Sequence, residues 1–298
     1  MNEPRTRKVV ARIAGGLGNQ LFGYAAARRL ALKNDAELVL DSISGFAYDP
    51  IYKRSFQLGN FSGNFREATA SERLEPFSKV RRYLMRFVNK YKNNNRKFFT
   101  DHTNSYDPSI LSVRFDRNVH MEGYWQDERY FKDCEVLIRK DLKIKPPTDE
   151  LNLWMSKSIK SHLSIAIHVR FFYDPDTGKD ICTTYYNAAI KEMERKFGNP
   201  HYYLFSDKPN EAEKKINLPS DRLTIINHNL GDENAYADLW LMSLCNHFII
   251  ASSTFSWWGA WLSERDSKHV IAPDYKIHGG GNAAKVFSQM ILKEWNQV

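Results

Sequence analysis

The chain has 298 residues, of which 42% are hydrophobic and 26% charged, as in globular proteins that bury one large core or two ordinary ones. Its three cysteines are scattered and form no CxxC pair, which excludes a disulfide framework and a zinc site of that pattern. The net charge of +8 fits an anionic partner or solubility alone, and no run reaches the roughly 18 apolar residues of a membrane span, so we expect a soluble cytoplasmic protein.

The N-terminal part predicts a strand, a helix and a second strand that lies parallel to the first. An apolar run at residues 9–13 is typical of a strand, and a glycine-rich run at 15–20 follows it. Residues 22–30 then repeat apolar side chains with a helical period, and 38–40 form another short apolar run. This order indicates a βαβ unit.

The glycine run matches no common phosphate-binding motif. No Gly-Lys-Ser/Thr follows it, and Leu21 stands where the dinucleotide fingerprint needs its third glycine. Glycines between a strand and a helix still let the backbone approach a ligand, and Asn19 and Gln20 can donate and accept hydrogen bonds there. A tight turn without a ligand is the alternative interpretation.

The region 42–135 has no clean period, and we expect it to shape an acceptor pocket. Paired prolines at 146–147 indicate a domain edge, so we predict domains at 1–150 and 151–298. The stretch 73–97 mixes aromatic residues with many cations, which are Lys79, Arg81, Arg82, Arg86, Lys90, Lys92, Arg96 and Lys97. Three interpretations stay open for it: a nucleic-acid surface, an amphipathic helix on a membrane, and a solvated basic helix.

From about residue 163 onward, strands and helices alternate, which is typical of a doubly wound α/β domain. The predicted strands are 163–169, 201–205, 223–226, 248–251 and 270–272. The predicted helices are 185–197, 210–216, 233–245 and 257–263. Right-handed crossovers make such strands parallel, so their carboxyl ends share one edge, where ligands bind.

Polar side chains follow each of these strands and suit a nucleotide diphosphate. They are His168 and Arg170, Ser206 and Asp207, Asn227 and His228, and Ser252, Ser253 and Thr254. A fixed guanidinium such as Arg170 can bind a phosphate bidentately and stabilise a departing diphosphate without a metal.

Each of these residues also has a structural interpretation. The hydroxyls at 252–254 can cap a helix rather than line a phosphate, although a helix N-terminus also binds phosphate well. Asp207 can cap the helix that begins near Pro209, and His168 can be a satisfied core histidine. The tryptophans at 257, 258 and 261 favour packing over a sugar platform.

Five segments, in this order, resemble the bacterial α-1,2-fucosyltransferases: GGLGNQLFGYAAARRLA, IHVR, CTTYYNAAI, YYLFSD and SSTFSWWGAWL. The resemblance covers residues 9–263, and the set of motifs is highly specific. The Gly-Asn-Gln and His-x-Arg segments are also similar to the wider α-1,2, α-1,6 and protein O-fucosyltransferase group.

The resemblance implies an α/β fold of GT-B type, in which two Rossmann-like domains face a cleft. Residues 1–150 would form the acceptor-side domain, and residues 151–298 would bind GDP-fucose. It implies transfer of L-fucose, with inversion and an α-1,2 linkage, to a galactoside hydroxyl of an oligosaccharide or lipid-linked glycan. It implies no required metal, and we expect no other cofactor and no nucleic-acid partner. The composition indicates a cytoplasmic enzyme, and the stretch 73–97 leaves a peripheral contact at the inner membrane open.

The resemblance also assigns site residues. Arg170 would hold the β-phosphate, and His168 and Asp207 would contact guanine or ribose. The remaining donor-site residues would line the diphosphate or approach the fucose from the first domain, and these are Ser252, Ser253, Thr254, Gly18, Asn19 and Gln20.

One segment departs from the family pattern His-x-Arg-Arg-Gly-Asp-Tyr. Phe171 replaces the second arginine, and the acid falls one place late, at Asp174. We expect direct displacement at the fucose anomeric carbon, with Arg170 stabilising the departing phosphate. If a base accepts the acceptor's proton, Asp174 and Asp176 are the candidates. A basic nucleic-acid- or membrane-surface-binding protein that uses 73–97 is the alternative function.

Overall fold

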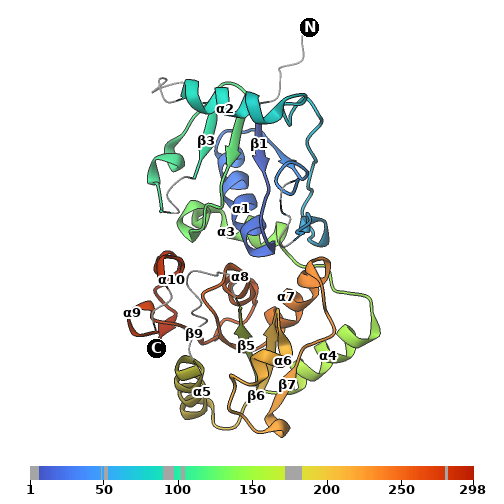
Figure 1. Cartoon of the computed structure of the whole chain (residues 1–298), viewed down its shortest axis with the longest axis vertical. Helices are drawn as coiled ribbons and strands as arrows, with labels where there is room; N and C mark the ends of the chain where they lie inside the picture. The colour runs from blue at the N-terminus through green and yellow to red at the C-terminus, as the bar shows by residue number, and fades with distance from the viewer. Residues whose placement is uncertain are drawn as a thin grey trace. The chain divides into compact units, whose positions relative to one another are not determined.

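The computed structural model describes residues 7–47, 49, 53–89, 97–101, 105–171, 183–278 and 281–298, except the side chains of 281–284. The chain forms two compact units, Met1–Lys143 and Ile144–Val298, each an α/β layer structure (Figure 1). They separate between Lys143 and Ile144, whereas the predicted boundary at 150/151 coincides with the start of a helix.

The first unit contains a parallel four-stranded sheet in the order β2-β1-β4-β3. Its strands are β1 (Lys8–Arg12), β2 (Glu37–Asp41), β3 (Phe98–Thr100) and β4 (Val119–Glu122). Its α-helices are α1 (Leu17–Lys33), α2 (Ser78–Asn89) and α3 (Glu135–Asp141). Short 3-10 helices are η1 (Leu58–Asn60), η2 (Pro108–Ser112), η3 (Glu128–Tyr130) and η4 (Lys132–Cys134). The N-terminal βαβ prediction is confirmed, because β1 and β2 are parallel neighbours joined by α1.

The second unit contains a parallel six-stranded sheet in the order β10-β9-β8-β5-β6-β7. Its strands are β5 (Ser164–Val169), β6 (His201–Ser206), β7 (Leu223–Ile225), β8 (His247–Ile249), β9 (Val270–Ala272) and β10 (Asn296–Gln297). Its longer helices are α4 (Glu150–Ser161), α5 (Thr183–Phe197), α7 (Ala235–Leu244), α8 (Thr254–Leu262) and α10 (Gly281–Ser288). Its shorter ones are α6 (Pro209–Glu213), α9 (Tyr275–His278), η5 (Ser220–Arg222) and η6 (Asp232–Asn234). The predicted α/β alternation is confirmed.

The strand order of the second unit reverses at β5. From β5 the chain adds β6 and β7 on one side, then returns to place β8 and β9 on the other. All six residues of β5 are buried, as expected for a central parallel strand with helices on both faces. Open α/β sheets bind ligands at such a switch point, outside the carboxyl ends of the strands.

The tryptophans of α8 belong to the core of the second unit. Trp257, Trp258 and Trp261 are at most 1% exposed, and the Trp257 indole N–H donates to the Met290 carbonyl at 2.9 Å. The packing interpretation is therefore confirmed. The helix also packs closely on α7, because a Cβ at Gly259 would lie 2.3 Å from the Met242 sulfur.

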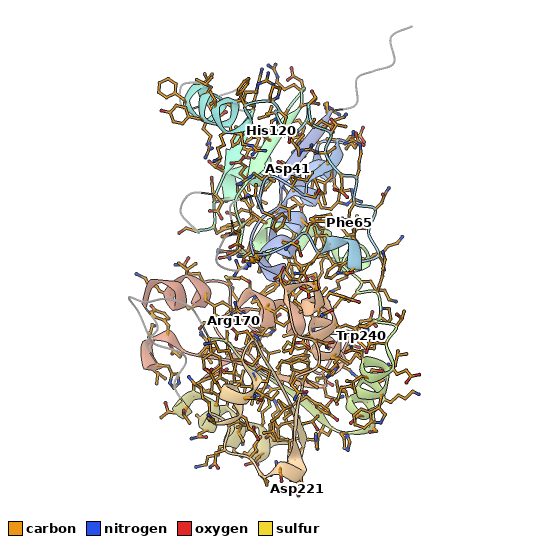
Figure 2. The ribbon with its side chains drawn as sticks, turned by 45° about the vertical axis from the view of Figure 1, so that its right-hand side comes forward. Asp41, Phe65, His120, Arg170, Asp221 and Trp240 are labelled. Carbon is orange, nitrogen blue, oxygen red and sulfur yellow. The ribbon has the colours of Figure 1, made fainter. Side chains whose placement is uncertain are left out.

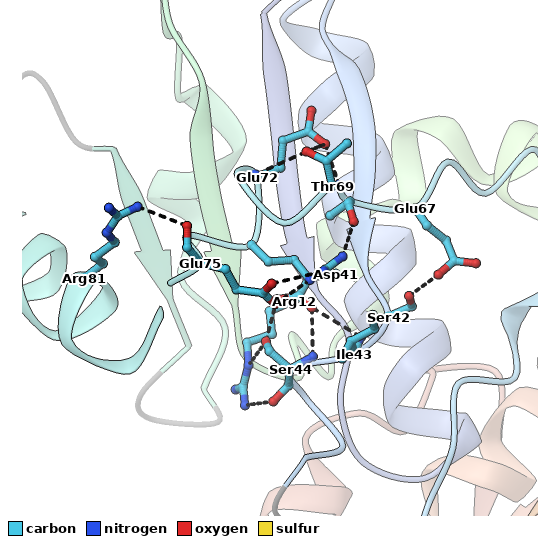
Figure 3. Close-up of polar contacts among 12 residues, drawn as sticks. Arg12, Asp41, Ser42, Ile43, Ser44, Glu67, Thr69, Glu72, Glu75 and Arg81 are labelled. Atoms are coloured by element: carbon cyan, nitrogen blue, oxygen red, sulfur yellow. Dashed lines mark hydrogen bonds and ion pairs between the residues drawn. The ribbon is translucent and has the colours of Figure 1, made fainter. Parts of the chain in front are cut away.

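A buried arginine attaches α2 to the sheet of the first unit. Arg82 Nη2 lies 2.6 Å from Asp41 Oδ2, and Arg82 Nε lies 3.1 Å from Glu122 Oε1. Asp41 also accepts a backbone hydrogen bond from Ser44 at 2.9 Å, which folds the turn after β2 (Figure 3). Since Asp41 is fully buried, its charge depends on these partners.

We predict that Arg82→Met destabilises the first unit by about 3–5 kcal/mol, because it leaves Asp41 buried without its cation and leaves Glu122 only the more distant Arg86, at 4.0 Å. Urea denaturation measures the loss, and hydrogen exchange at β2 and β4 assigns it to this unit. Arg117→Met is the control: Arg117 pairs with exposed Asp116, and the change should stay within about 0.5 kcal/mol. An Arg82→Met variant as stable as the wild type would show that the buried pair is unimportant.

Candidate functional site

The carboxyl edge of the second sheet brings three predicted segments to one level. Val169 at the end of β5 lies opposite Ser206 of β6, so Arg170 and Asp207 follow side by side. Ile167 lies opposite Ile249 of β8, which places Ser252 level with Arg170 on the other side. Neighbouring strands are about 4.8 Å apart, so the polar groups after these strands are neighbours.

Arg170 and Asp207 form an ion pair at this edge. Arg170 Nη1 lies 3.2 Å from Asp207 Oδ2, and about a quarter of each side chain is exposed. Asp207 Oδ1 also accepts the backbone N–H of Phe171 at 3.1 Å. The capping interpretation of Asp207 is wrong, because α6 begins after Lys208 and has no side-chain cap. The carboxylate instead orients the guanidinium. Figure 2 shows Arg170 at the end of the unit opposite Asp221, which precedes β7.

His168 is buried just beneath this pair. The side chain is 4% exposed, its ring lies 5.4 Å from the Phe255 ring, and Nδ1 has no hydrogen-bond partner in the described part of the chain. Burial, with a smaller effect of the Arg170 charge, lowers the pKa of His168 to about 3. The imidazole is therefore neutral at physiological pH. It is a core histidine, as one interpretation held, but its ring is not fully satisfied.

The three hydroxyls after β8 lie at the start of α8. Ser253 is the N-cap, and its hydroxyl accepts the Phe255 backbone N–H at 3.3 Å. The capping interpretation is thus confirmed for Ser253. Ser252 and Thr254 flank it and are half-buried. The helix N-terminus beside Arg170 favours a negative group by its dipole as well.

Two buried tyrosines support this edge, and the sequence did not reveal their role. The Tyr185 hydroxyl shares its one hydrogen between the carbonyls of Ile250 at 2.7 Å and Ile271 at 3.0 Å, which ties the ends of β8 and β9 together. The Tyr186 hydroxyl donates to the His168 carbonyl at 3.1 Å. The sequence predicted a helix over 185–197, but nothing in it shows which carbonyls the two hydroxyls reach.

Phe171, which replaces the arginine of the family pattern, is half-buried against the core of the second unit. The ammonium groups of Lys215 and Lys208 lie 4.8 and 5.6 Å from its ring centroid. These distances are typical of cation–π contacts. Two lysines from the segment after β6 therefore keep positive charge near Phe171.

His228, after β7, joins a polar network rather than the ion pair. Its Nε2 lies 3.0 Å from the Asn152 side-chain oxygen, and burial lowers its pKa. Asn229 donates from Nδ2 to Asn152 at 3.0 Å and to Asp238 at 2.9 Å. This network fixes the loop after β7 to α4.

The glycine turn of the first unit is built as the sequence suggested. Gly15 has a positive φ of 78°, and the Gly16 carbonyl accepts the backbone N–H groups of Asn19 and Gln20 at 2.9 and 3.1 Å. Gly18 lies buried in the first turn of α1. A Cβ at Gly16 would lie 3.5 Å from Arg54 Nε, so a cation that the sequence analysis missed lies beside this turn.

The side chains of the turn are partly engaged within the first unit. Gln20 is fully buried and donates from Nε2 to the carbonyls of Gly15 at 3.0 Å and Ser55 at 2.8 Å. Asn19 is half-buried, and its Oδ1 accepts from Gln126 at 2.8 Å. Gln20 therefore holds the turn together. A contact of Asn19 or Gln20 with the donor sugar stays a prediction.

The first unit also contains a cavity of about 690 Å³ within the predicted acceptor region 42–135. Its aromatic lining residues are Tyr83, Phe87, Phe98, Phe99 and Trp125. Its polar lining residues are Arg86, Asn89, Thr100, Asp107 and Ser109. The buried indole N–H of Trp125 has no partner among the described residues. Aromatic walls with a few polar groups are typical of small-molecule pockets.

Asp174 and Asp176, the candidate bases, lie outside the described residues. Within the described ranges, no three His, Cys, Asp or Glu side chains are grouped to hold a metal ion. The same part of the chain has no helix both long and apolar enough to cross a bilayer.

Comparisons with known proteins agree with this architecture. The fucosyltransferase NodZ from Bradyrhizobium superposes with a TM-score of 0.56 at 14% identity, covering 93% of this chain and 97% of NodZ. NodZ α-1,6-fucosyltransferase co-crystallized with GDP gives a TM-score of 0.54 at 14% identity, over 91% and 96% of the two chains. These similarities show that the fold is of GT-B type.

Sequence comparison gives the family. An α-1,2-colitosyltransferase of Escherichia coli is 29% identical over 277 residues, or 89% of this chain and 91% of that protein. The O-antigen biosynthesis glycosyltransferase WbnK of Escherichia coli is 28% identical over 92% of this chain and 96% of that protein. The model of glycosyl transferase family 11 matches residues 9–298. The chain therefore belongs to glycosyl transferase family 11.

Proposed function

We propose that this glycosyltransferase moves L-fucose from GDP-fucose to a galactoside hydroxyl of a glycan and forms an α-1,2 linkage. The observation that carries the proposal is the pairing of Arg170 with Asp207 at the strand switch point, next to the N-terminus of α8. A fixed cation beside a helix N-terminus matches a diphosphate in both charge and hydrogen-bond geometry.

The relatives support the choice of donor and linkage. A NodZ structure was soaked with GDP-fucose, and another was co-crystallized with GDP. One relative is named for an α-1,2 transfer and the other for O-antigen biosynthesis. We therefore propose a GDP-sugar donor and a surface-polysaccharide type of acceptor.

In the proposed donor complex, Arg170 binds the β-phosphate and Asp207 keeps its guanidinium oriented. His168 stays neutral, so it contributes a hydrogen bond through Nδ1 to the ribose or base without adding charge. The half-buried hydroxyls of Ser252 and Thr254 line the diphosphate. Asn19 stays our proposed contact to the fucose, and Gly18 and Gln20 would act by holding the turn that presents it.

The proposed reaction is a single displacement. The acceptor oxygen forms a bond to the anomeric carbon of fucose, while the bond from that carbon to the phosphate oxygen breaks and GDP leaves with the electron pair. Arg170 stabilises the transition state more than the bound donor, because the negative charge on the phosphate that it faces grows as the bond breaks. The β-linked fucosyl group of the donor becomes α-linked.

The hydroxyl of the acceptor sugar loses its proton late in this step, and we propose Asp174 or Asp176 as the base that takes it. The proposal needs no metal, because Arg170 and the N-terminus of α8 supply the positive potential at the diphosphate. We also propose that the acceptor sugar binds the aromatic cavity of the first unit, whose wall includes Trp125.

A second candidate donor sugar is colitose, which is fucose without its 3-hydroxyl. The colitosyltransferase that matches nearly all of this chain favours it. A site that binds the 3-hydroxyl would reject colitose, because a buried polar group would be left unpaired.

We predict that Arg170→Ala weakens GDP binding by about 1.5–3 kcal/mol in calorimetry without metal, as expected for a lost hydrogen bond to a charged group. Arg170→Lys should lose less, because it keeps the charge but not the two-pronged geometry. Arg195→Ala is the control, since Arg195 pairs with Glu192 on the surface of the same unit. Unchanged GDP affinity in Arg170→Ala would remove Arg170 from the donor site.

We predict that the GDP-linked form of fucose is used in preference to that of colitose. Competition between the two donors measures the ratio of kcat/KM directly. Proton NMR of the product should show the small H1–H2 coupling of an α-fucoside. A β-linked product would contradict single displacement, and a preference for colitose would replace fucose by the second candidate.

We predict that Ser109→Trp, which places a bulky ring at the cavity, raises KM for the acceptor about tenfold or more and leaves GDP affinity unchanged. Ser112→Trp, on the same exposed 3-10 helix but outside the cavity lining, is the matched control. Equal acceptor kinetics in the two variants would exclude the cavity as an acceptor site.

A further inference from the structure

Helix α2 exposes the face that its sequence pattern would bury. Its apolar residues recur at i, i+3, i+4, i+7 and i+8, the spacing of a core-facing stripe. They are nevertheless exposed: Val80 by 57%, Tyr83 by 66%, Leu84 by 53%, Phe87 by 50% and Val88 by 45%. Phe77, just before the helix, is 76% exposed. Figure 1 shows α2 along the margin of the first unit.

The inward face of α2 is polar instead. Arg82 is the buried residue of the helix, and it forms the ion pairs with Asp41 and Glu122. Asn89, on the same side, donates to the Phe98 carbonyl at 2.7 Å. These bonds fix the rotation of the helix about its axis. If the apolar stripe turned inward, Arg82 would turn outward and leave Asp41 and Glu122 buried without its charge.

Cations flank the exposed stripe. Lys79 and Arg81 are exposed on its two sides, whereas Arg86 pairs with Glu122 at 4.0 Å and lines the cavity. The sequence of α2 contains no acidic residue, and the whole chain carries a net charge of +8. An apolar stripe bordered by cations, on a helix with low mean hydropathy, matches the interface of an anionic bilayer.

We propose that α2 docks the protein on a membrane surface that contains anionic phospholipid. The helix lies in the plane of the interface, where Val80, Leu84 and Val88 enter the boundary between headgroups and acyl chains, while Tyr83 and Phe87 stay at the wall of the cavity. Lys79 and Arg81 face the lipid phosphates. This inference does not depend on the identity of the donor or the acceptor.

Charge favours this occupant over two others. A second copy of the chain on the same face would bring the α2 cations of both copies together, which is unfavourable. A nucleic acid would pair with Lys79 and Arg81 but would leave the aliphatic residues of the stripe without apolar contacts. An anionic bilayer satisfies both parts of the face.

The test is co-sedimentation of the full chain with vesicles of phosphatidylcholine alone or mixed with phosphatidylglycerol. We expect binding to the mixed vesicles. A triple variant with Val80→Ser, Leu84→Ser and Val88→Ser should bind at least about tenfold more weakly, because it removes the apolar groups that would enter the bilayer. These three positions do not line the cavity, and circular dichroism checks that the fold is kept.

Matched variants separate this face from general surface properties. The apolar control is Val136→Ser, Leu151→Ser and Leu153→Ser, which removes equally exposed side chains elsewhere. Lys79→Gln with Arg81→Gln should also lose binding to the mixed vesicles, whereas Lys157→Gln with Lys160→Gln on α4 should not.

Three results would overturn the proposal. The first is an absence of binding to the mixed vesicles, and the second is an equal loss in the control variants. The third is concentration-dependent self-association of the wild type that the triple variant abolishes, since a second copy would then cover the stripe. GDP calorimetry on the same variants keeps this test separate from the donor site: weaker vesicle binding with unchanged GDP affinity supports the proposal.

Discussion

Parallel pairing of β5 with β6 on one side and β8 on the other is the constraint on which the site depends. Because the three strands end at one edge, residues distant in the sequence become neighbours there. Arg170 meets Asp207, and the N-cap of α8 follows β8 at the same level. The carboxylate orients the guanidinium at the place where an α/β sheet binds its ligand. Architecture and charge thus support a diphosphate at the same edge.

The first unit shows how one buried charge can determine an outer surface. Arg82 compensates two carboxylates at the ends of β2 and β4, and so it fixes which side of α2 faces the sheet. The apolar stripe of the helix is left outside as a consequence. Exposed apolar area of this kind marks an interaction surface. The ion pair therefore links the stability of the unit to the membrane contact that we propose.

Much of the fold could be predicted because the second unit has strong local signals. Its buried strand β5 and the alternating helices gave the sheet, and family motifs gave the GT-B type. Residues 42–135 were harder, since β3 and β4 are only a few residues long. The outward orientation of the apolar stripe of α2 could not be predicted. The helical period shows that a stripe exists but not which side of the helix faces the sheet. A helix cap and a ligand contact stayed equal alternatives for Asp207, because its ion-pair partner lies 37 residues earlier in the sequence.

A crystal structure of the chain with GDP would show whether the nucleotide binds at this edge of the second sheet. We expect diphosphate oxygens within hydrogen-bond distance of the Arg170 guanidinium, next to the first turn of α8, and a ribose or guanine group near His168. The nucleotide bound elsewhere, or an empty site at saturating GDP, would contradict the assignment of the donor site to this edge of the second unit.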